Sequence, residues 1–343
     1  MSFGVHAIIL AGAHQWRPSV FERWLPRTLV PIANRPLIDY PLSWLRSAEL
    51  MHVRICANSD THFLKQRLGH GASHEIGISF YEDHLPRGPA GCAADAARDM
   101  DADTFVLVDG TIIPQSIHLP SVLEDHASAG AAFTIVAHQT QQSTRMRPAL
   151  VPTGVYICSR RALRFISTTG YQDIKEMLLP RLHDAGEAIA VHTVDSIAPR
   201  VSGAATSFGA TAFVLSMMLE SPNEISCYER RSDALVHDTA RIGDGVHMLG
   251  PVLIGADTVV EDGAMIVGPT SIGEGCRIKR ESKICRSILW NAAAVGESAY
   301  VDHSILTFGS IVPAEANITR QIHYRSRSAG NLIRRAFRPS RIG

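Results

Sequence analysis

The chain has 343 residues, of which 45% are hydrophobic, and its basic and acidic side chains balance at 33 each. This length and apolar content suffice for two domains with buried cores. No segment approaches the roughly eighteen uninterrupted apolar residues of a membrane-spanning helix, and the N-terminus lacks a basic-then-apolar signal pattern. We therefore expect a cytoplasmic protein, and we expect no nucleic-acid partner.

The first forty residues carry the pattern of a ligand site. An apolar run at 7–10 stops at Ala11-Gly12, which predicts a buried parallel strand that ends in a tight turn. A long basic loop follows and leads into a helix near Asp39, whose first turn would hold Pro41. A strand, a glycine turn and a loop before a helix are typical of the mouth of a phosphate or nucleotide site.

The next 180 residues alternate between strand and helix patterns. The expected strands are 52–58, 76–81, 104–108, 132–137 and 155–158, and the expected helices are 60–68, 121–130, 173–185 and 207–220. A glycine-rich loop at 85–94 would precede a further helix that ends at Met100. The alternation predicts a doubly wound, Rossmann-like α/β domain with its ligand at the carboxyl ends of the strands.

A six-residue repeat begins near residue 234. Every sixth residue is apolar over ten consecutive positions: Val236, Ile242, Met248, Ile254, Val260, Ile266, Ile272, Ile278, Ile284 and Trp290. The residue four positions after each of these apolar residues is mostly small or β-branched. This period predicts a parallel β-helix. The expected boundaries are an α/β domain at 1–220, a linker at 221–233, the β-helix at 234–313 and a basic tail at 314–343.

The opening stretch resembles the sugar-phosphate nucleotidyltransferases, also called NDP-sugar pyrophosphorylases. The matching positions of the family's glycine-rich loop and its continuation are Leu10-Ala11-Gly12, Arg17, Pro26, Leu29, Pro31 and 34–38. Several members carry a hexapeptide-repeat, left-handed β-helix after the catalytic domain, which is the order found here. The resemblance covers roughly 310 residues and implies a nucleotide or nucleotide sugar as ligand.

The resemblance also implies roles for individual residues. Arg17 and Arg27 would be the catalytic cations that neutralise phosphate. Asp109 would be a metal ligand, with Mg²⁺ as the ion if the protein is active. The positions expected to contact nucleotide or sugar are Leu10, Ala11, Gly12, Gly88, Gly91, Asp109 and Gly154.

Four parts of the family's chemistry are altered. Arg27 stands at the signature lysine, and the chain has no lysine before Lys65 and none from there to Lys175. Asp-Gly-Thr at 109–111 replaces the family's Asn-Gly-Asp, which displaces or removes the first metal carboxylate. The best match to the second metal motif, at 198–203, puts Arg200 where the ion should be. The interval 138–154, where the family has a Glu-Lys pair, contains neither residue type.

These departures favour a catalytically degenerate member: a nucleotide-sugar-binding, regulatory or scaffolding subunit in sugar-nucleotide or polysaccharide synthesis, working as a homo-oligomer or with an active paralogue. The alternative is an active sugar-1-phosphate nucleotidyltransferase, with Asp109 on the metal and Arg17 and Arg27 on the triphosphate. A hexapeptide-repeat acyltransferase would need a catalytic histidine, and nothing distinguishes the surroundings of His237, His247 or His303.

A third hypothesis is based on the C-terminal charge. Residues 316–343 contain seven arginines and no acidic residue, which leaves a net charge of about minus seven on the preceding residues by subtraction from zero. Such a tail would dock on a protein partner or an anionic surface. In that case the chain would be an assembly protein built on its β-helix.

Overall fold

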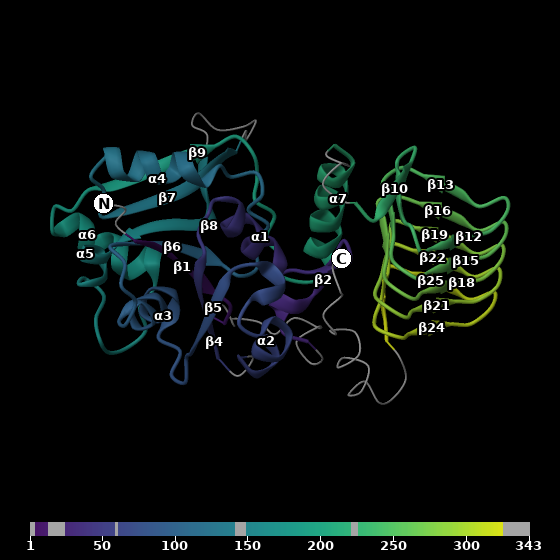
Figure 1. Cartoon of the computed structure of the whole chain (residues 1–343), viewed down its shortest axis with the longest axis horizontal. Coiled ribbons are helices and arrows are strands. Elements are labelled where there is room, and N and C mark those ends of the chain that lie inside the picture. The colour runs from purple at the N-terminus through teal and green to yellow at the C-terminus, as the bar shows by residue number, and fades with distance from the viewer. Residues whose placement is uncertain (1–3, 13–24, 59–60, 141–148, 221–225, 325–343) are drawn as a thin grey trace.

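The computed structural model describes residues 4–12, 25–58, 61–140, 149–220 and 226–324. It contains a Rossmann-like α/β domain followed by a parallel β-helix, as the sequence predicts (Figure 1). Within the described residues, no helix is both long and apolar enough to cross a membrane.

A seven-stranded mixed sheet forms the centre of the first domain. Its spatial order is β5 (Gly77–Glu82), β4 (His52–Ala57), β1 (Val5–Leu10), β6 (Thr104–Asp109), β8 (Ala149–Ser159), β7 (Phe133–Thr140) and β9 (Ile189–Val194). The first four strands are mutually parallel, and β8 runs antiparallel to both of its neighbours. The sequence did not predict β9, in which half-buried and exposed residues alternate and no long apolar run occurs.

Helices cover both faces of the sheet because the central strands are apolar on both sides. Ala7 and Ile9 face one core and Ile8 and Leu10 face the other. The first core contains residues from α1 (Asp39–Ser47), α2 (Thr61–Leu68), α4 (Leu119–Ser128) and α7 (Ala204–Glu220). The second contains residues from α3 (Gly88–Ala97), α5 (Arg160–Leu163), a π-helical turn η4 (Ile174–Leu178) and α6 (Leu179–Asp184).

Short elements complete this domain. The basic loop before α1 contains a 3-10 turn η2 (Arg27–Leu29) and a small antiparallel hairpin of β2 (Pro31–Ile32) and β3 (Arg35–Pro36). A second 3-10 turn, η3 (Ala72–His74), follows α2.

The predicted loop at 85–94 is wrong, because α3 already begins at Gly88 and ends at Ala97. Proline in the first turn and the alanines that follow favour a helix there.

The β-helix has three parallel sheets. One contains β11 (Ala234–His237), β14 (Val252–Ile254), β17 (Thr270–Ile272), β20 (Ile288–Leu289), β23 (Ile305–Leu306) and β26 (Ile322–His323). The second contains β12 (Arg241–Ile242), β15 (Val259–Val260), β18 (Arg277–Ile278), β21 (Ala294–Val295) and β24 (Ile311–Val312). The third contains β13 (His247–Leu249), β16 (Met265–Val267), β19 (Lys283–Cys285), β22 (Tyr300–Asp302) and β25 (Asn317–Thr319).

The predicted interior column is right up to Ile284 and wrong at Trp290. Pairing partners are 18 residues apart up to Val267 with Cys285, and 17 apart from Ser271 with Ile288 onward. Because the coils from this point on are each a residue shorter, Leu289 takes the interior position and Trp290 packs in the core shared with the α/β domain. The sequence Ile288-Leu289-Trp290 is apolar throughout, so its periodicity cannot show the shift.

The β-helix also differs from its expected boundaries. Within the expected linker, β10 (Tyr228–Arg231) pairs antiparallel with β11. At the other end, β25 and β26 continue the coil beyond residue 313 into the expected tail. The basic residues of the tail from 325 onward lie outside the described residues.

The two domains share a core around α7. Figure 1 shows α7 standing between the α/β domain and the stacked coils. Leu253, Ile288 and Trp290 of the β-helix belong to the same buried cluster as residues of α7 and of the central sheet. Phe208 of α7 also stacks on His303, with ring centroids 4.3 Å apart. The contact therefore combines apolar burial with an aromatic pair.

Two adjacent residues can test this interface. Leu253 faces the shared core and Ile254 faces the coil interior, and both are fully buried. We expect Leu253→Ala and Ile254→Ala each to lower the free energy of unfolding by about 2–5 kcal/mol. Only Leu253→Ala should also speed hydrogen–deuterium exchange in α7, because it alone removes contacts to that layer. Equal α7 exchange in the two variants would contradict this assignment.

Candidate functional site

The carboxyl ends of three parallel strands meet at one edge of the sheet. Leu10, the last residue of β1, lies in register with Cys56 of β4 and with Asp109 at the end of β6. Beyond Leu10, the Ala11 amide donates to the Cys56 carbonyl at 2.7 Å, and the Gly110 amide donates to the Leu10 carbonyl at 3.0 Å. The register thus brings the turn after β1 beside the turn after β6.

Several predicted site residues meet at this edge. Leu10 lies beside Asp109, Ala11 lies beside Gly110, and Gly154 of β8 lies on the other side of the Asp109 carboxylate. Gly12 follows in the same turn and lies against Asn58. A side chain added at Gly12 would lie 3.1 Å from the Asn58 amide nitrogen, so the turn approaches β4 closely. The Leu10 side chain itself is buried in the helix-covered core. Any contact of Leu10 with a ligand would therefore come from its backbone.

Arg27 lies near the same edge. It begins η2, and the next residue, Thr28, is buried against the turn after β6: a side chain at Gly110 would lie 3.1 Å from the Thr28 methyl group. Arg17, the other predicted cation, lies outside the described residues. Their catalytic roles stay predictions.

Gly88 and Gly91 lie in a different environment. Both are in the first turn of α3, and Gly88 has a φ of +79°. A Cβ at Gly88 would lie 2.6 Å from the Gln172 carbonyl oxygen, and one at Gly91 would lie 2.7 Å from the Cβ of Arg87. Close packing thus requires glycine at both positions, and neither has Asp109 among its nearest neighbours. A role in binding nucleotide or sugar stays a prediction.

The Asp109 carboxylate is almost completely buried and is bonded through both oxygens. Its Oδ1 accepts hydrogen bonds from the Thr111 amide at 2.9 Å and the Thr111 hydroxyl at 2.7 Å. Its Oδ2 forms an ion pair with Nη1 of Arg200. Only 4% of the Asp109 side chain is exposed, against 42% of Arg200. A buried carboxylate requires such a countercharge, and Arg200 supplies it.

Backbone pairing holds Arg200 in place. The Ile113 amide donates to the Pro199 carbonyl at 2.9 Å, and the Val201 amide donates to the Thr111 carbonyl at 2.8 Å. Between these bonds, Ile112 and Arg200 form an antiparallel bridge. The segment around Arg200 is therefore fixed alongside the turn after β6, although the two lie about ninety residues apart in sequence.

Tyr156 lies near this ion pair. Burial raises the pKa of its hydroxyl, the positive charge of Arg200 lowers it and the negative charge of Asp109 raises it further.

The arrangement does not fit a divalent metal at Asp109. Arg200 holds one carboxylate oxygen and Thr111 the other. Across the residues that the structure describes, no three His, Cys, Asp or Glu side chains are grouped in a way that could hold a metal ion. The sequence correctly indicated Arg200 as the residue facing this position. It did not indicate Thr111, because a hydroxyl that bonds a nearby carboxylate leaves no sequence motif.

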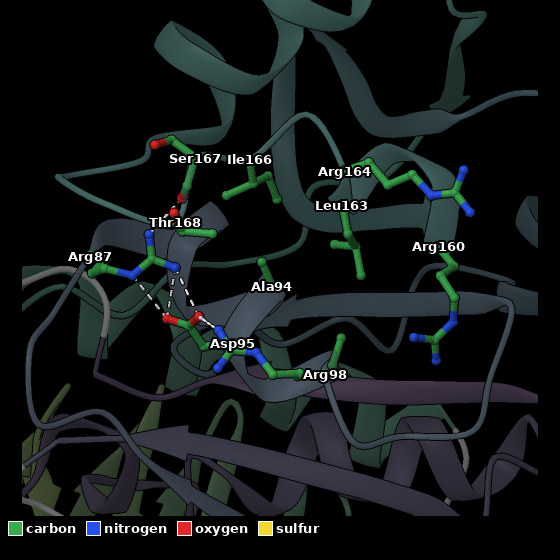
Figure 2. Close-up of a pocket in the computed structure, with 11 residues that line it drawn as sticks. Arg87, Ala94, Asp95, Arg98, Arg160, Leu163, Arg164, Ile166, Ser167 and Thr168 are labelled. Atoms are coloured by element: carbon green, nitrogen blue, oxygen red, sulfur yellow. Dashed lines mark hydrogen bonds and ion pairs between the residues drawn. The ribbon is translucent and has the colours of Figure 1, made fainter.

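Away from this edge, a concave region lies between α3 and α5 (Figure 2). Arg87 donates to Asp95 at 2.8–2.9 Å and Arg98 donates to the same carboxylate at 2.8 Å. Arg160 donates to the Ala102 carbonyl at 2.7 Å. Figure 2 shows the guanidinium groups of Arg87 and Arg98 directed at Asp95 from two sides. The Arg87 and Arg98 bonds tie the two ends of α3 to its own Asp95, and the Arg160 bond joins α5 to the segment before β6, so the charges of these three arginines serve internal pairing.

Comparison with known proteins shows what the chain is similar to. Residues 6–147 match the model of the nucleotidyl transferase family. The chain is 22% identical over 329 residues to a UTP–glucose-1-phosphate uridylyltransferase of Synechocystis sp., which covers 85% of this chain and 84% of the relative. It is 22% identical over 303 residues to a mannose-1-phosphate guanylyltransferase of Mycobacterium tuberculosis, covering 80% of this chain and 83% of that one. It is 23% identical over 330 residues to a glucose-1-phosphate thymidylyltransferase of Streptomyces griseus, covering 88% of this chain and 91% of that one.

These similarities support the nucleotidyltransferase resemblance of the N-terminal domain. The alignments with relatives cover at least 80% of the chain, so they are not confined to the matched residues 6–147. The relatives are named for attaching a nucleotide to a sugar 1-phosphate.

Two glycines provide a test of how tightly the ion pair is enclosed. Gly154 has a φ of +97°, and a Cβ there would lie 2.7 Å from Nη2 of Arg200 and 3.2 Å from the Cβ of Asp109. Gly170 has a φ of +73° with nothing within 4 Å. Backbone strain should cost either alanine variant about 1–2 kcal/mol, and crowding should cost Gly154→Ala about 1–3 kcal/mol more. Chemical denaturation measures both, and equal losses would show that the pair has room to move.

Proposed function

We propose that this protein binds a nucleotide or nucleotide sugar without catalysing nucleotidyl transfer, and that it regulates or scaffolds sugar-nucleotide or polysaccharide synthesis. The observation that carries the proposal is the ion pair between Asp109 and Arg200 at the carboxyl edge of the sheet. The family resemblance puts a metal-binding carboxylate in this region. Here the carboxylate is already neutralised by a side chain.

The backbone frame of the edge supports the binding part of the proposal. The turn at Ala11-Gly12 and the turn after Asp109 lie side by side, at the place where ligands bind in open α/β sheets. The absence of catalysis is supported by the paired carboxylate. In phosphoryl and nucleotidyl transfer, metal charge supplies several kcal/mol of transition-state stabilisation. A guanidinium whose charge is shared with a buried carboxylate replaces only part of it.

A protein partner is part of the proposal: a second copy of this chain or an active paralogue, in the cytoplasm. The β-helix exposes large apolar side chains on its outer surface, among them Leu249 at 56% and Ile311 at 63% exposure. They lie on two different sheets, Leu249 in β13 and Ile311 in β24, so each of these faces offers an apolar contact point to a partner.

A pyrophosphate-release assay tests the proposal directly. Purified protein with Mg²⁺ would be offered each nucleoside triphosphate against a panel of hexose 1-phosphates. We expect no turnover, together with measurable heat of binding for UDP-glucose, GDP-mannose or dTDP-glucose in calorimetry.

Gly12→Asp provides the control, because it places a charge beside Asn58 in the turn and should abolish binding. Turnover above that of this variant would establish the alternative, an active sugar-1-phosphate nucleotidyltransferase. Folded protein that neither turns over nor binds would refute both.

A further inference from the structure

The Arg200 guanidinium has donors beyond those that pair with Asp109. Its Nη1 bonds the carboxylate, while Nη2 lies near Gly154, where a Cβ would be 2.7 Å away. Arginine carries five N–H donors in a planar fork that suits the oxygens of phosphate. With 42% of the side chain exposed, the group is partly open to solvent at the edge where the strands end.

The position of this guanidinium is fixed before any ligand arrives. Backbone hydrogen bonds from Ile113 and Val201 flank it, and the buried carboxylate of Asp109 orients it. A ligand therefore meets a preorganised cation and need not order a flexible side chain, which is the main cost of recruiting a surface arginine. By contrast, Arg87 and Arg98 in the depression between α3 and α5 both point at Asp95.

Resting on the proposed function, we infer that Arg200 is the resident cation of the site: it contacts the phosphate groups of the nucleotide or nucleotide sugar directly, and binding requires no divalent metal. The inference follows from a disagreement between family and structure. A metal ion would have to displace the guanidinium from Asp109 or approach it against like charge, and both are unfavourable.

Calorimetry with UDP-glucose, GDP-mannose and dTDP-glucose, in excess EDTA and in excess Mg²⁺, tests the inference. We expect the dissociation constant of the nucleotide sugar that binds to agree within about twofold between the two conditions. Binding that occurs only with Mg²⁺ would overturn the inference and leave the proposed function standing. Folded protein that binds none of the three under either condition would overturn both.

Three variants separate a ligand contact from a purely structural role. Arg200→Gln should weaken binding in EDTA by about tenfold or more, but it also leaves Asp109 without its countercharge. The double variant Arg200→Gln/Asp109→Asn removes both charges, and a melting curve establishes that it is folded. We expect the same loss of binding in the double variant.

Recovery of wild-type affinity in the double variant would show that Arg200 serves only to neutralise Asp109, and would overturn the inference. Arg164→Gln is the matched control, because this exposed arginine lies in the depression between α3 and α5 rather than at the strand ends. Its affinity should equal that of the wild type. An equal loss in Arg164→Gln would mean that overall charge, and not the contact at Arg200, governs binding.

Discussion

The structure of the site depends on the countercharge of one buried carboxylate. Asp109 ends a strand that is buried on both faces, so its charge must be compensated by protein groups within reach. Thr111 and Arg200 provide that compensation, and each brings its own segment to the edge of the sheet. Glycine is needed at position 154 for the same reason, since any side chain on Gly154 would occupy the space of the Arg200 guanidinium. A single ion pair thus determines three features of the site.

The same ion pair lies close in sequence to the contact between the domains. Four residues after Arg200 the chain enters α7, whose start is fixed by the Ser207 amide and hydroxyl, both of which donate to the Gly203 carbonyl. Further along, Phe208 stacks on His303 of the β-helix. A short stretch of chain therefore joins the carboxyl edge of the sheet in the first domain to the packed surface of the second. The fully buried residues of α7, from Ser207 to Leu215, recur at helical spacing, so one face of the helix is packed.

The sequence predicted different features of the two domains. Strict six-residue periodicity identified the β-helix and its interior as far as Ile284, because each coil repeats the same environment. It missed the shorter coil at Leu289, where three consecutive apolar residues fit two registers equally well. In the α/β domain, apolar runs located the central strands and Asp109 at a strand end. The position of Arg200 in a motif indicated that it lies near Asp109. The sequence did not indicate the Thr111 hydroxyl as a partner of Asp109. It also did not indicate that a helix begins at Gly88, where the local pattern resembles a loop.

The pairing of Asp109 with an arginine also bears on how a site of this type can lose its metal. Removing the partner of a buried charge costs about 3–5 kcal/mol. A site that holds its carboxylates by means of an ion is exposed to that cost whenever the ion leaves. An arginine in place of the second carboxylate removes one negative charge and adds a permanent positive one, so the remaining carboxylate stays compensated under all conditions. A single replacement of a carboxylate by arginine therefore removes a metal ligand and adds a fixed cation at the same time. Under the proposed function, the frame of the site is stable without a bound ion, because Arg200 compensates Asp109.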